Sequence, residues 1–201
     1  DNDIVVTTNP ARIRGPFIRY GCGDAVPGVD TDFNSAAFIR LVSDKSAFAR
    51  LMKEHNIHSP IYHQTTKPTK YPVLIRKTLN SSGGRGIVVC PNTAAFDAEW
   101  ENQFVWTPFI KTQFELRVHV LGGKVVKIFK KRFVGINNDE AAPDQKEPAL
   151  PIRNLQRGYH YSAREIPTYA KIEPLVKKLD PILGGKFYTL DVGWDKDKQE
   201  Y

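Results

Sequence analysis

A Ser/Gly-rich segment, residues 81–86, has the residue types that bind phosphate groups. It separates two runs rich in β-branched residues, 73–76 and 87–89. Backbone N–H groups of a glycine-rich loop approach phosphate oxygens closely because no Cβ intervenes, and Ser82 adds a hydroxyl donor. Arg76, at the end of the first run, carries a guanidinium that suits a phosphate. The pattern predicts a phosphate-binding loop between two strands. A plain glycine-rich hairpin is the alternative, because no Walker sequence is present.

The segment 114–120 alternates apolar and polar residues, as a strand with one buried face does. This alternation places Glu115, Arg117 and His119 on one face. A cross-strand ion pair facing water, worth about 0.2–1 kcal/mol, would explain the charges. The functional interpretation is that Glu115 accepts a hydrogen bond from a ribose hydroxyl while Arg117 faces phosphates. We expect the next strand to bring four further cations to this region: Lys127, Lys130, Lys131 and Arg132.

Asp191 lies within an otherwise apolar run, Leu190-Asp191-Val192-Gly193-Trp194. An acid inside a strand costs free energy unless it is paired or binds a cation. Mg²⁺ is usually held by one or two carboxylates together with substrate phosphates. Asp191 is therefore a candidate Mg²⁺ ligand.

The elements that must position these residues follow from local patterns. Ser43 is predicted as the N-cap of a helix that ends at His58-Ser59-Pro60. Gly122-Gly123 predicts a tight hairpin turn, because both positions allow positive φ. The other predicted elements are a short helix from Asn92, strands over 114–121, 124–132 and 187–194, a helix over 171–183 and a surface loop over 137–151. Strands and helices are mixed, so the fold class is α+β or α/β.

Composition narrows the function classes. The 201 residues suffice for one large or two small domains, and no run of about 18 apolar residues predicts a membrane span. Lysines and arginines exceed acids by 29 − 22 = 7, which favours an anionic partner such as a nucleotide or an acidic peptide, with nucleic acid the weakest candidate. Two cysteines without metal-type spacing indicate a reducing compartment, so we expect a cytoplasmic protein. The first residue is Asp1 rather than Met, so we expect the natural N-terminus to lie upstream.

The order of the motifs resembles the ATP-grasp superfamily of carboxylate–amine ligases over roughly residues 41–201. The hairpin and the Asn154 segment look most like the ribosomal-protein glutamate ligases of that superfamily. The resemblance rests on Ser43-Asp44-Lys45 followed by Ile57-His58-Ser59-Pro60, on Pro72-Val73-Leu74-Ile75-Arg76, on Glu115-Leu116-Arg117-Val118 with Gly122, on Asn154-Leu155-Gln156-Arg157-Gly158, and on Asp191.

The resemblance implies an α+β ATP-grasp fold, in which two α/β subdomains with mainly antiparallel sheets grip ATP. It divides the chain into a remnant of an N-terminal subdomain (1–42), a central subdomain with the glycine-rich lid (43–110) and a C-terminal subdomain (111–201). The last of these stops before the family's Glu-x-Asn metal motif, so we expect a fragment of a longer ligase. The segment 16–21 is most similar to compact phage-borne or bacterial members.

The implied reaction is ATP-dependent formation of an amide or peptide bond through an acyl phosphate, with Mg²⁺ as the metal. The partners would be small-molecule or peptide carboxylates and amines, with no membrane, and a homo-oligomer is compatible with them. Asp191 would hold Mg²⁺, and Lys131, Asn154 and Arg157 would act on the transferring phosphoryl group. The implied ATP contacts are Lys45, Arg76 (with Lys77 as its substitute), Ser82, Gly83, Gly84, Arg85, Gly86, Phe109, Ile110, Glu115 and Arg117.

One position departs from the family pattern. Pro108 stands seven residues before Glu115, where the family has an acid for the adenine amino group. Backbone groups near Phe109 and Ile110 would have to recognise adenine instead. The alternative from another class is therefore a nucleotide-binding or structural module that has lost catalysis. It predicts nucleotide binding without turnover.

Overall fold

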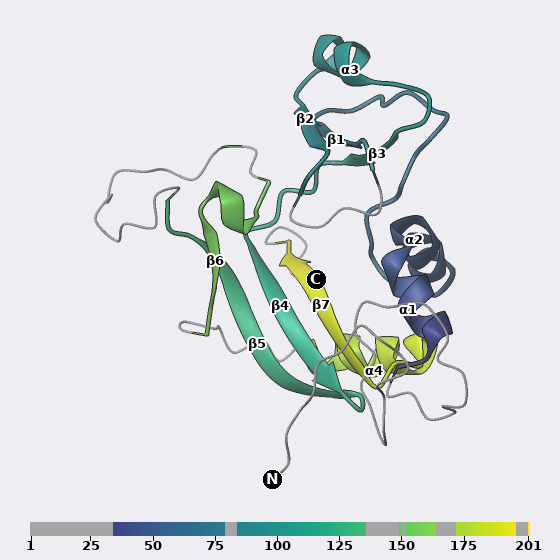
Figure 1. Ribbon diagram of the computed structural model, residues 1–201, viewed down its shortest axis with the longest axis vertical. Helices are drawn as coiled ribbons and strands as arrows, with labels where there is room; N and C mark the ends of the chain where they lie inside the picture. Colours follow the sequence, from purple (N-terminus) through teal and green to yellow (C-terminus); the bar gives the residue numbers. More distant parts are fainter. Residues whose placement is uncertain (1–33, 79–83, 136–148, 150–151, 164–171, 196–200) are drawn as a thin grey trace, which may run out of the picture.

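The computed structural model describes residues 34–78, 84–135, 149, 152–163, 172–195 and 201. The described residues form two antiparallel sheets, four α-helices and a short 3-10 helix (Figure 1), which confirms the α+β class. None of the described helices is long and apolar enough to span a membrane. Residues 1–33, the lid residues Ser82 and Gly83, and most of the predicted loop over 137–151 lie outside the described residues.

The smaller sheet, in the upper part of Figure 1, has the strand order β2-β1-β3. Val73 and Ile75 alternate into its core, where they meet Phe96 from the helix, and all three side chains are fully buried. The two strands predicted on either side of the lid pair with each other, and the short helix after Asn92 is confirmed. The elements are β1 (Val73–Arg76), β2 (Ile87–Cys90), α3 (Thr93–Glu99) and β3 (Val105–Pro108).

The larger sheet has the strand order β6-β5-β4-β7. Its strands are β4 (Phe114–Leu121), β5 (Lys124–Phe133), β6 (Tyr159–Ser162) and β7 (Phe187–Trp194). Gly122 and Gly123 join β4 to β5 with φ values of 54° and 71°, which confirms the predicted hairpin turn. The predicted strands over 114–121 and 187–194 are confirmed as β4 and β7.

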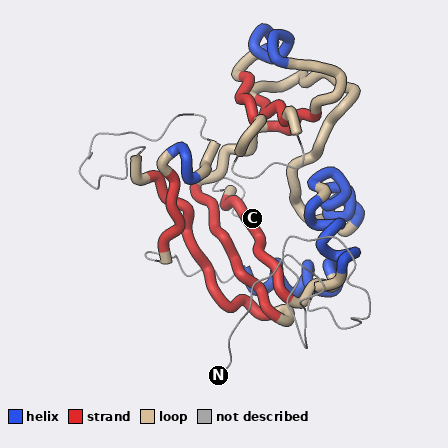
Figure 2. Tube along the Cα trace, in the orientation of Figure 1, coloured by secondary structure: helices blue, strands red, loops and turns tan. Residues whose placement is uncertain are grey.

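Three helices share a core with one face of the larger sheet: α1 (Ala36–Ser43), α2 (Lys45–Glu54) and α4 (Ile172–Leu183). Leu116 and Val118 of β4 are buried there with Phe38 of α1, Met52 of α2 and Val176 of α4. Figure 2 shows these helices in blue near the red strands of this sheet, apart from α3 on the smaller one. The domain boundary between residues 42 and 43 stays a prediction; it falls within the last turn of α1, and α1 and α2 belong to one core.

The predicted start of the helix after Ser43 is wrong by one residue. Ser43 is the last residue of α1, a helix that the sequence analysis did not predict. The next residue, Asp44, is the N-cap of α2, because its carboxylate accepts a hydrogen bond from the Ala47 N–H at 2.9 Å.

The predicted end of this helix is also wrong, because α2 ends at Glu54 rather than at His58. Asn56 adopts a left-handed conformation with φ 53°. The Ile57 N–H then donates to the Met52 carbonyl at 2.9 Å. This is a Schellman cap with asparagine in the place that glycine usually takes.

Candidate functional site

The face of the larger sheet opposite the helices carries a carboxylate held between two cations. Strand register places Lys131 of β5 opposite Glu115 of β4. Lys131 Nζ lies 2.8 Å from Glu115 Oε2, and Arg153 Nη1 lies 3.3 Å from Glu115 Oε1. Both cationic side chains are only 11% exposed. Burial acts to lower the pKa of Lys131, but the charge and hydrogen bond of Glu115 outweigh it, so this pKa is raised.

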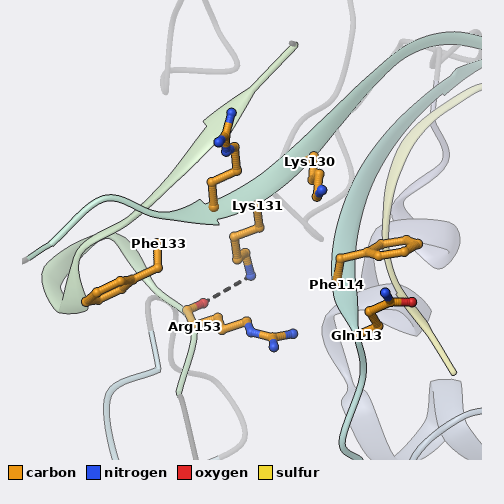
Figure 3. A pocket seen from close by; sticks show the side chains of 7 residues that line it. Gln113, Phe114, Lys130, Lys131, Phe133 and Arg153 are labelled. Atoms are coloured by element: carbon orange, nitrogen blue, oxygen red, sulfur yellow. Dashed lines mark hydrogen bonds between the residues drawn. The ribbon is translucent and has the colours of Figure 1, made fainter. Parts of the chain in front are cut away.

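Arg153 ties a loop to the start of β4, and the sequence analysis missed it. Its guanidinium donates to Thr112 Oγ1 at 2.8 Å and to the Thr112 carbonyl at 3.2 Å. The Arg153 carbonyl accepts a hydrogen bond from Lys131 Nζ at 3.0 Å, drawn as a dashed line in Figure 3. Its position in the sequence could have identified it, because Arg153 directly precedes the Asn154 segment on which the resemblance partly rests.

Beside this cluster, Arg117 of β4 and Asp191 of β7 lie opposite each other. The guanidinium binds the carboxylate through two hydrogen bonds of 2.8 Å. Tyr161 of β6, also missed from the sequence, places its ring centroid 4.2 Å from the Arg117 guanidinium. Burial, followed by the charge of Asp191, raises the pKa of the Tyr161 hydroxyl. The predicted phosphate ligand and the predicted metal ligand therefore contact each other in this structure.

The four cations of β5 that were expected in this region are divided between the two faces of the sheet. Residues opposite each other in an antiparallel pair share a face, and Lys127 and Lys131 lie opposite His119 and Glu115. Lys130 lies opposite Leu116, and Arg132 follows it by two residues, so both belong to the other face. The period of two along a strand explains the difference.

Gly84, the first lid residue that the structure describes, lies against the loop that contains Ile152 and Asn154. Gly84 has φ 73°, and a Cβ placed on it would lie 2.7 Å from Asn154 Nδ2 and 3.0 Å from Ile152 Cγ2. Asn154 precedes the 3-10 helix η2 (Leu155–Arg157), and its Oδ1 accepts a hydrogen bond from the Arg157 N–H at 2.9 Å. The structure thus brings Gly84 and Asn154 together, and leaves Arg157 and Arg85 exposed.

Lys45 and Arg76, predicted to hold the same phosphates, come from α2 and β1. The Arg76 Nε atom is buried and has no hydrogen-bond partner. Its guanidinium lies 5.6 Å from the ring centroid of Tyr62. Burial, followed by the positive charge of Arg76, lowers the pKa of Lys45, which places two cations in one neighbourhood.

Lys77, predicted as the substitute for Arg76, contacts the smaller sheet's helix instead of Lys45. Lys77 forms an ion pair of 2.9 Å with Glu99 of α3, and this hydrogen bond raises the pKa of Lys77. At the end of β3, the Phe109 N–H donates to the Pro72 carbonyl at 3.1 Å. This bond engages one of the backbone groups expected for adenine, whereas the next residue, Ile110, is exposed.

Among the described residues, no group of three or more His, Cys, Asp or Glu side chains could hold a metal ion. Asp191 therefore stays a prediction as a single carboxylate ligand. Its side chain is 51% exposed, which leaves it within reach of a cation from solvent.

No protein-family model matches the chain, and no curated protein matches it in sequence. Solved structures do match. VanG D-Ala:D-Ser ligase from Enterococcus faecalis superposes with a TM-score of 0.60 and 16% identity, over 83% of this chain and 52% of that one. A RimK domain ATP-grasp protein from Sphaerobacter thermophilus gives 0.57 and 18%, over 83% and 60%.

D-alanine–D-alanine ligase from Bacillus anthracis, solved with ATP, gives a TM-score of 0.54 and 12% identity, over 81% of this chain and 55% of that one. The chain thus spans little more than half the length of these solved structures. The likeness covers more than four fifths of this chain. By its architecture, this chain has the ATP-grasp fold.

Proposed function

We propose that the complete protein is an ATP-dependent ligase that joins a carboxylate to an amine. The observation that carries the proposal is the buried Arg76 Nε without a partner, close to Lys45. Two neighbouring cations in a partly desolvated place repel each other unless an anion lies between them. The triphosphate of a nucleotide supplies such an anion, and guanidinium groups bind phosphate in two-point fashion.

The lid supports the same position for the phosphates. Gly84 fits against Asn154 only because it lacks a Cβ, so the lid end and the Asn154 loop form a close cradle. Gly86 accepts a hydrogen bond from the Lys77 N–H at 2.8 Å, which anchors the lid to the end of β1. With Ser82, Gly83 and Arg85, these residues would cover the phosphates from the smaller sheet.

The larger sheet supplies the charges for the chemistry. In the proposed reaction, a substrate carboxylate oxygen attacks the γ-phosphorus of ATP, and the bond to the β-phosphate oxygen breaks to release ADP. The amine then attacks the acyl carbon. A C–N bond forms, phosphate leaves, and the amine proton goes to solvent. Lys131 and Arg157 would stabilise the negative charge of the transferring group, and Glu115 would accept from the ribose.

Asp191 would hold Mg²⁺, since a half-exposed carboxylate is the kind of oxygen donor that this ion takes. The ion would neutralise phosphate charge. Asp191 now binds Arg117 through both oxygens, so its release is a step that this chain's own residues must make. Arg117 is then available to face the phosphates.

Titration of the full-length protein with ADP and with ATP in Mg²⁺ buffer tests the proposal. Arg76→Met should weaken nucleotide binding by about ten-fold or more, because one charge-assisted contact is lost. Lys77→Met is the matched control: it removes the next cation, which is paired with Glu99, and should leave binding unchanged. The absence of nucleotide binding would overturn the proposal.

Turnover separates the ligase from a non-catalytic module. ADP release should depend on both acid and amine in a panel of amino acids and small carboxylic acids. Asp191→Asn should abolish that release. Nucleotide binding without any release of ADP across the panel would instead support the module that has lost catalysis.

A further inference from the structure

Tyr62, which the sequence analysis did not single out and the proposed function does not use, contacts Arg76. The Arg76 guanidinium lies over its ring, with Cζ 5.6 Å from the ring centroid. An aromatic face attracts a cation at this separation. The Tyr62 side chain is half-buried, and burial raises the pKa of its hydroxyl against the opposing effect of the Arg76 charge. The ring is therefore partly shielded from water, which strengthens such a contact.

The segment that carries Tyr62 is attached to the smaller sheet. The next residue, His63, exchanges two backbone hydrogen bonds of 2.9 Å with Trp106 of β3, and the two rings stack with centroids 4.1 Å apart. Trp106 in turn lies opposite Ile75 of β1. Tyr62 and Arg76 are each one residue away from this cross-strand row, and successive side chains of extended chain point to opposite faces. Both side chains therefore belong to the face of the sheet opposite Ile75.

The ring restricts the guanidinium without using its hydrogen-bond donors. An aromatic ring attracts a cation through its face, whereas a guanidinium donates from N–H groups in its own plane. The buried Arg76 Nε atom has no hydrogen-bond partner, so no hydrogen bond at this atom orients the side chain. Ordering a long side chain opposes ligand binding, and a contact that already restricts the side chain reduces this cost.

We propose that Tyr62 is a positioning residue, whose ring holds the Arg76 guanidinium in the orientation that binds the phosphates of a nucleotide. The inference rests on the proposed function, in which Arg76 is a phosphate ligand. Tyr62 acts through Arg76, and its hydroxyl has no part in the effect. The nucleotide then meets an arginine that is already ordered, and it binds more tightly than it would without the ring.

Calorimetric titration of the full-length protein with ADP in Mg²⁺ buffer tests the role of the ring. Tyr62→Leu should weaken ADP binding by about three- to ten-fold, because the ordering of Arg76 then opposes binding. Tyr62→Phe keeps the ring and should keep the affinity. The matched control is Ile61→Ala, at a neighbouring side chain that is 49% exposed, and it should leave ADP affinity unchanged.

A double substitution separates positioning from a merely structural role. When Arg76→Met is already present, Tyr62→Leu should cause no further loss of ADP affinity, because the group that it positions is absent. An equal loss with and without Arg76 would assign the ring to the structure of its own segment and overturn the inference. A loss in Tyr62→Phe as large as in Tyr62→Leu would overturn it as well, because the hydroxyl would then carry the effect.

The proposed function and this inference fail in different ways. ADP affinity that is unchanged in Tyr62→Leu would overturn the inference and leave the nucleotide site in place. The predicted losses in a protein that binds ADP but never turns over would support the inference and overturn the ligase. An unsubstituted protein that binds no ADP would overturn both.

Discussion

The two sheets differ in how their charged side chains are partnered. On the larger sheet, charges meet charges: Glu115 lies between Lys131 and Arg153, and Arg117 binds Asp191. On the smaller sheet, the Arg76 Nε atom is buried without a hydrogen-bond partner. Burial, followed by the positive charge of Arg76, lowers the pKa of Lys45 of α2. The charged face of the larger sheet, here called the paired wall, thus has its cations matched by carboxylates of the chain, whereas the second wall, around Arg76, holds a buried guanidinium nitrogen without a hydrogen-bond partner. The difference separates a surface whose charges are matched within the chain from one that, under the proposed function, binds phosphate.

The largest expected effect concerns the paired wall. Glu115→Leu should lower the free energy of unfolding by about 2–3 kcal/mol, because Lys131 and Arg153 then stay buried without their carboxylate. The partial exposure of Glu115, 29%, keeps the loss below that of a fully buried pair. Urea denaturation followed by circular dichroism measures the change. Arg76→Met, which removes an unpaired group, should leave stability equal or higher. The comparison fails if both variants lose the same stability.

The contact between Gly84 of the lid and Asn154 should have the next largest effect on stability. Gly84→Ala forces an L-residue into φ 73° and places a Cβ 2.7 Å from Asn154 Nδ2. The matched control is Gly122→Ala, with φ 54° and no atom within 4 Å of the added Cβ. Both variants should lose about 1–2 kcal/mol from backbone strain. Gly84→Ala should lose more, and equal losses in thermal denaturation would mean that the lid end does not contact Asn154 in solution.

The third prediction concerns the ring of Tyr161, which lies against two cations of the paired wall. Its ring lies under the Arg117 guanidinium at 4.2 Å and 5.5 Å from Lys131 Nζ. Tyr161→Leu should therefore cost about 0.5–1 kcal/mol of stability at this exposed site. Tyr161→Phe keeps the ring and should be neutral. A loss in Tyr161→Phe as large as in Tyr161→Leu, measured by urea denaturation, would assign the effect to the hydroxyl instead of the ring.

Local patterns predicted the elements that depend on neighbours in sequence. The alternation in 114–120 predicts a strand with one buried face, and Gly122-Gly123 predicts the turn that closes its hairpin. The Glu115–Lys131 pair does not follow from the turn alone, because a β-bulge shifts the register between His119 and Val120; without it, Glu115 would lie opposite Lys130. β6 was not predicted because four residues are too few to show a pattern, although its two tyrosines favour a strand; its pairing with β5 identifies it.

Contacts between distant segments could not be predicted. The Arg117–Asp191 pair needs the β4–β7 pairing, which joins residues 74 apart in the chain. The contact of Gly84 with Asn154 needs the relative position of the two sheets. The end of α2 could have been predicted from local sequence, because asparagine is a known alternative to glycine at this cap position, but the prediction relied on Pro60 instead of Asn56.

The smallest expected effect is a pH dependence of ADP binding. Its sign distinguishes Lys45, near Arg76, from Lys131 on the larger sheet. The pKa of Lys45 is lowered below 10.5 by burial and then by Arg76, whereas that of Lys131 is raised above 10.5. Anion binding favours charged Lys45, so binding takes up a proton once the pH exceeds the lowered pKa. ADP affinity should therefore fall as pH rises toward 10.5.

Stability should respond to Lys45 in the opposite direction. Below 10.5 the unfolded chain binds more protons at this lysine than the folded one does, so its contribution to the free energy of unfolding increases with pH. Lys45→Arg stays charged and should remove the pH dependence of ADP affinity, whereas Lys53→Met, at an exposed lysine of the same helix, should preserve it. ADP affinity that is unchanged between pH 8 and pH 10 in the unsubstituted protein would contradict a charge on Lys45 that serves the phosphates.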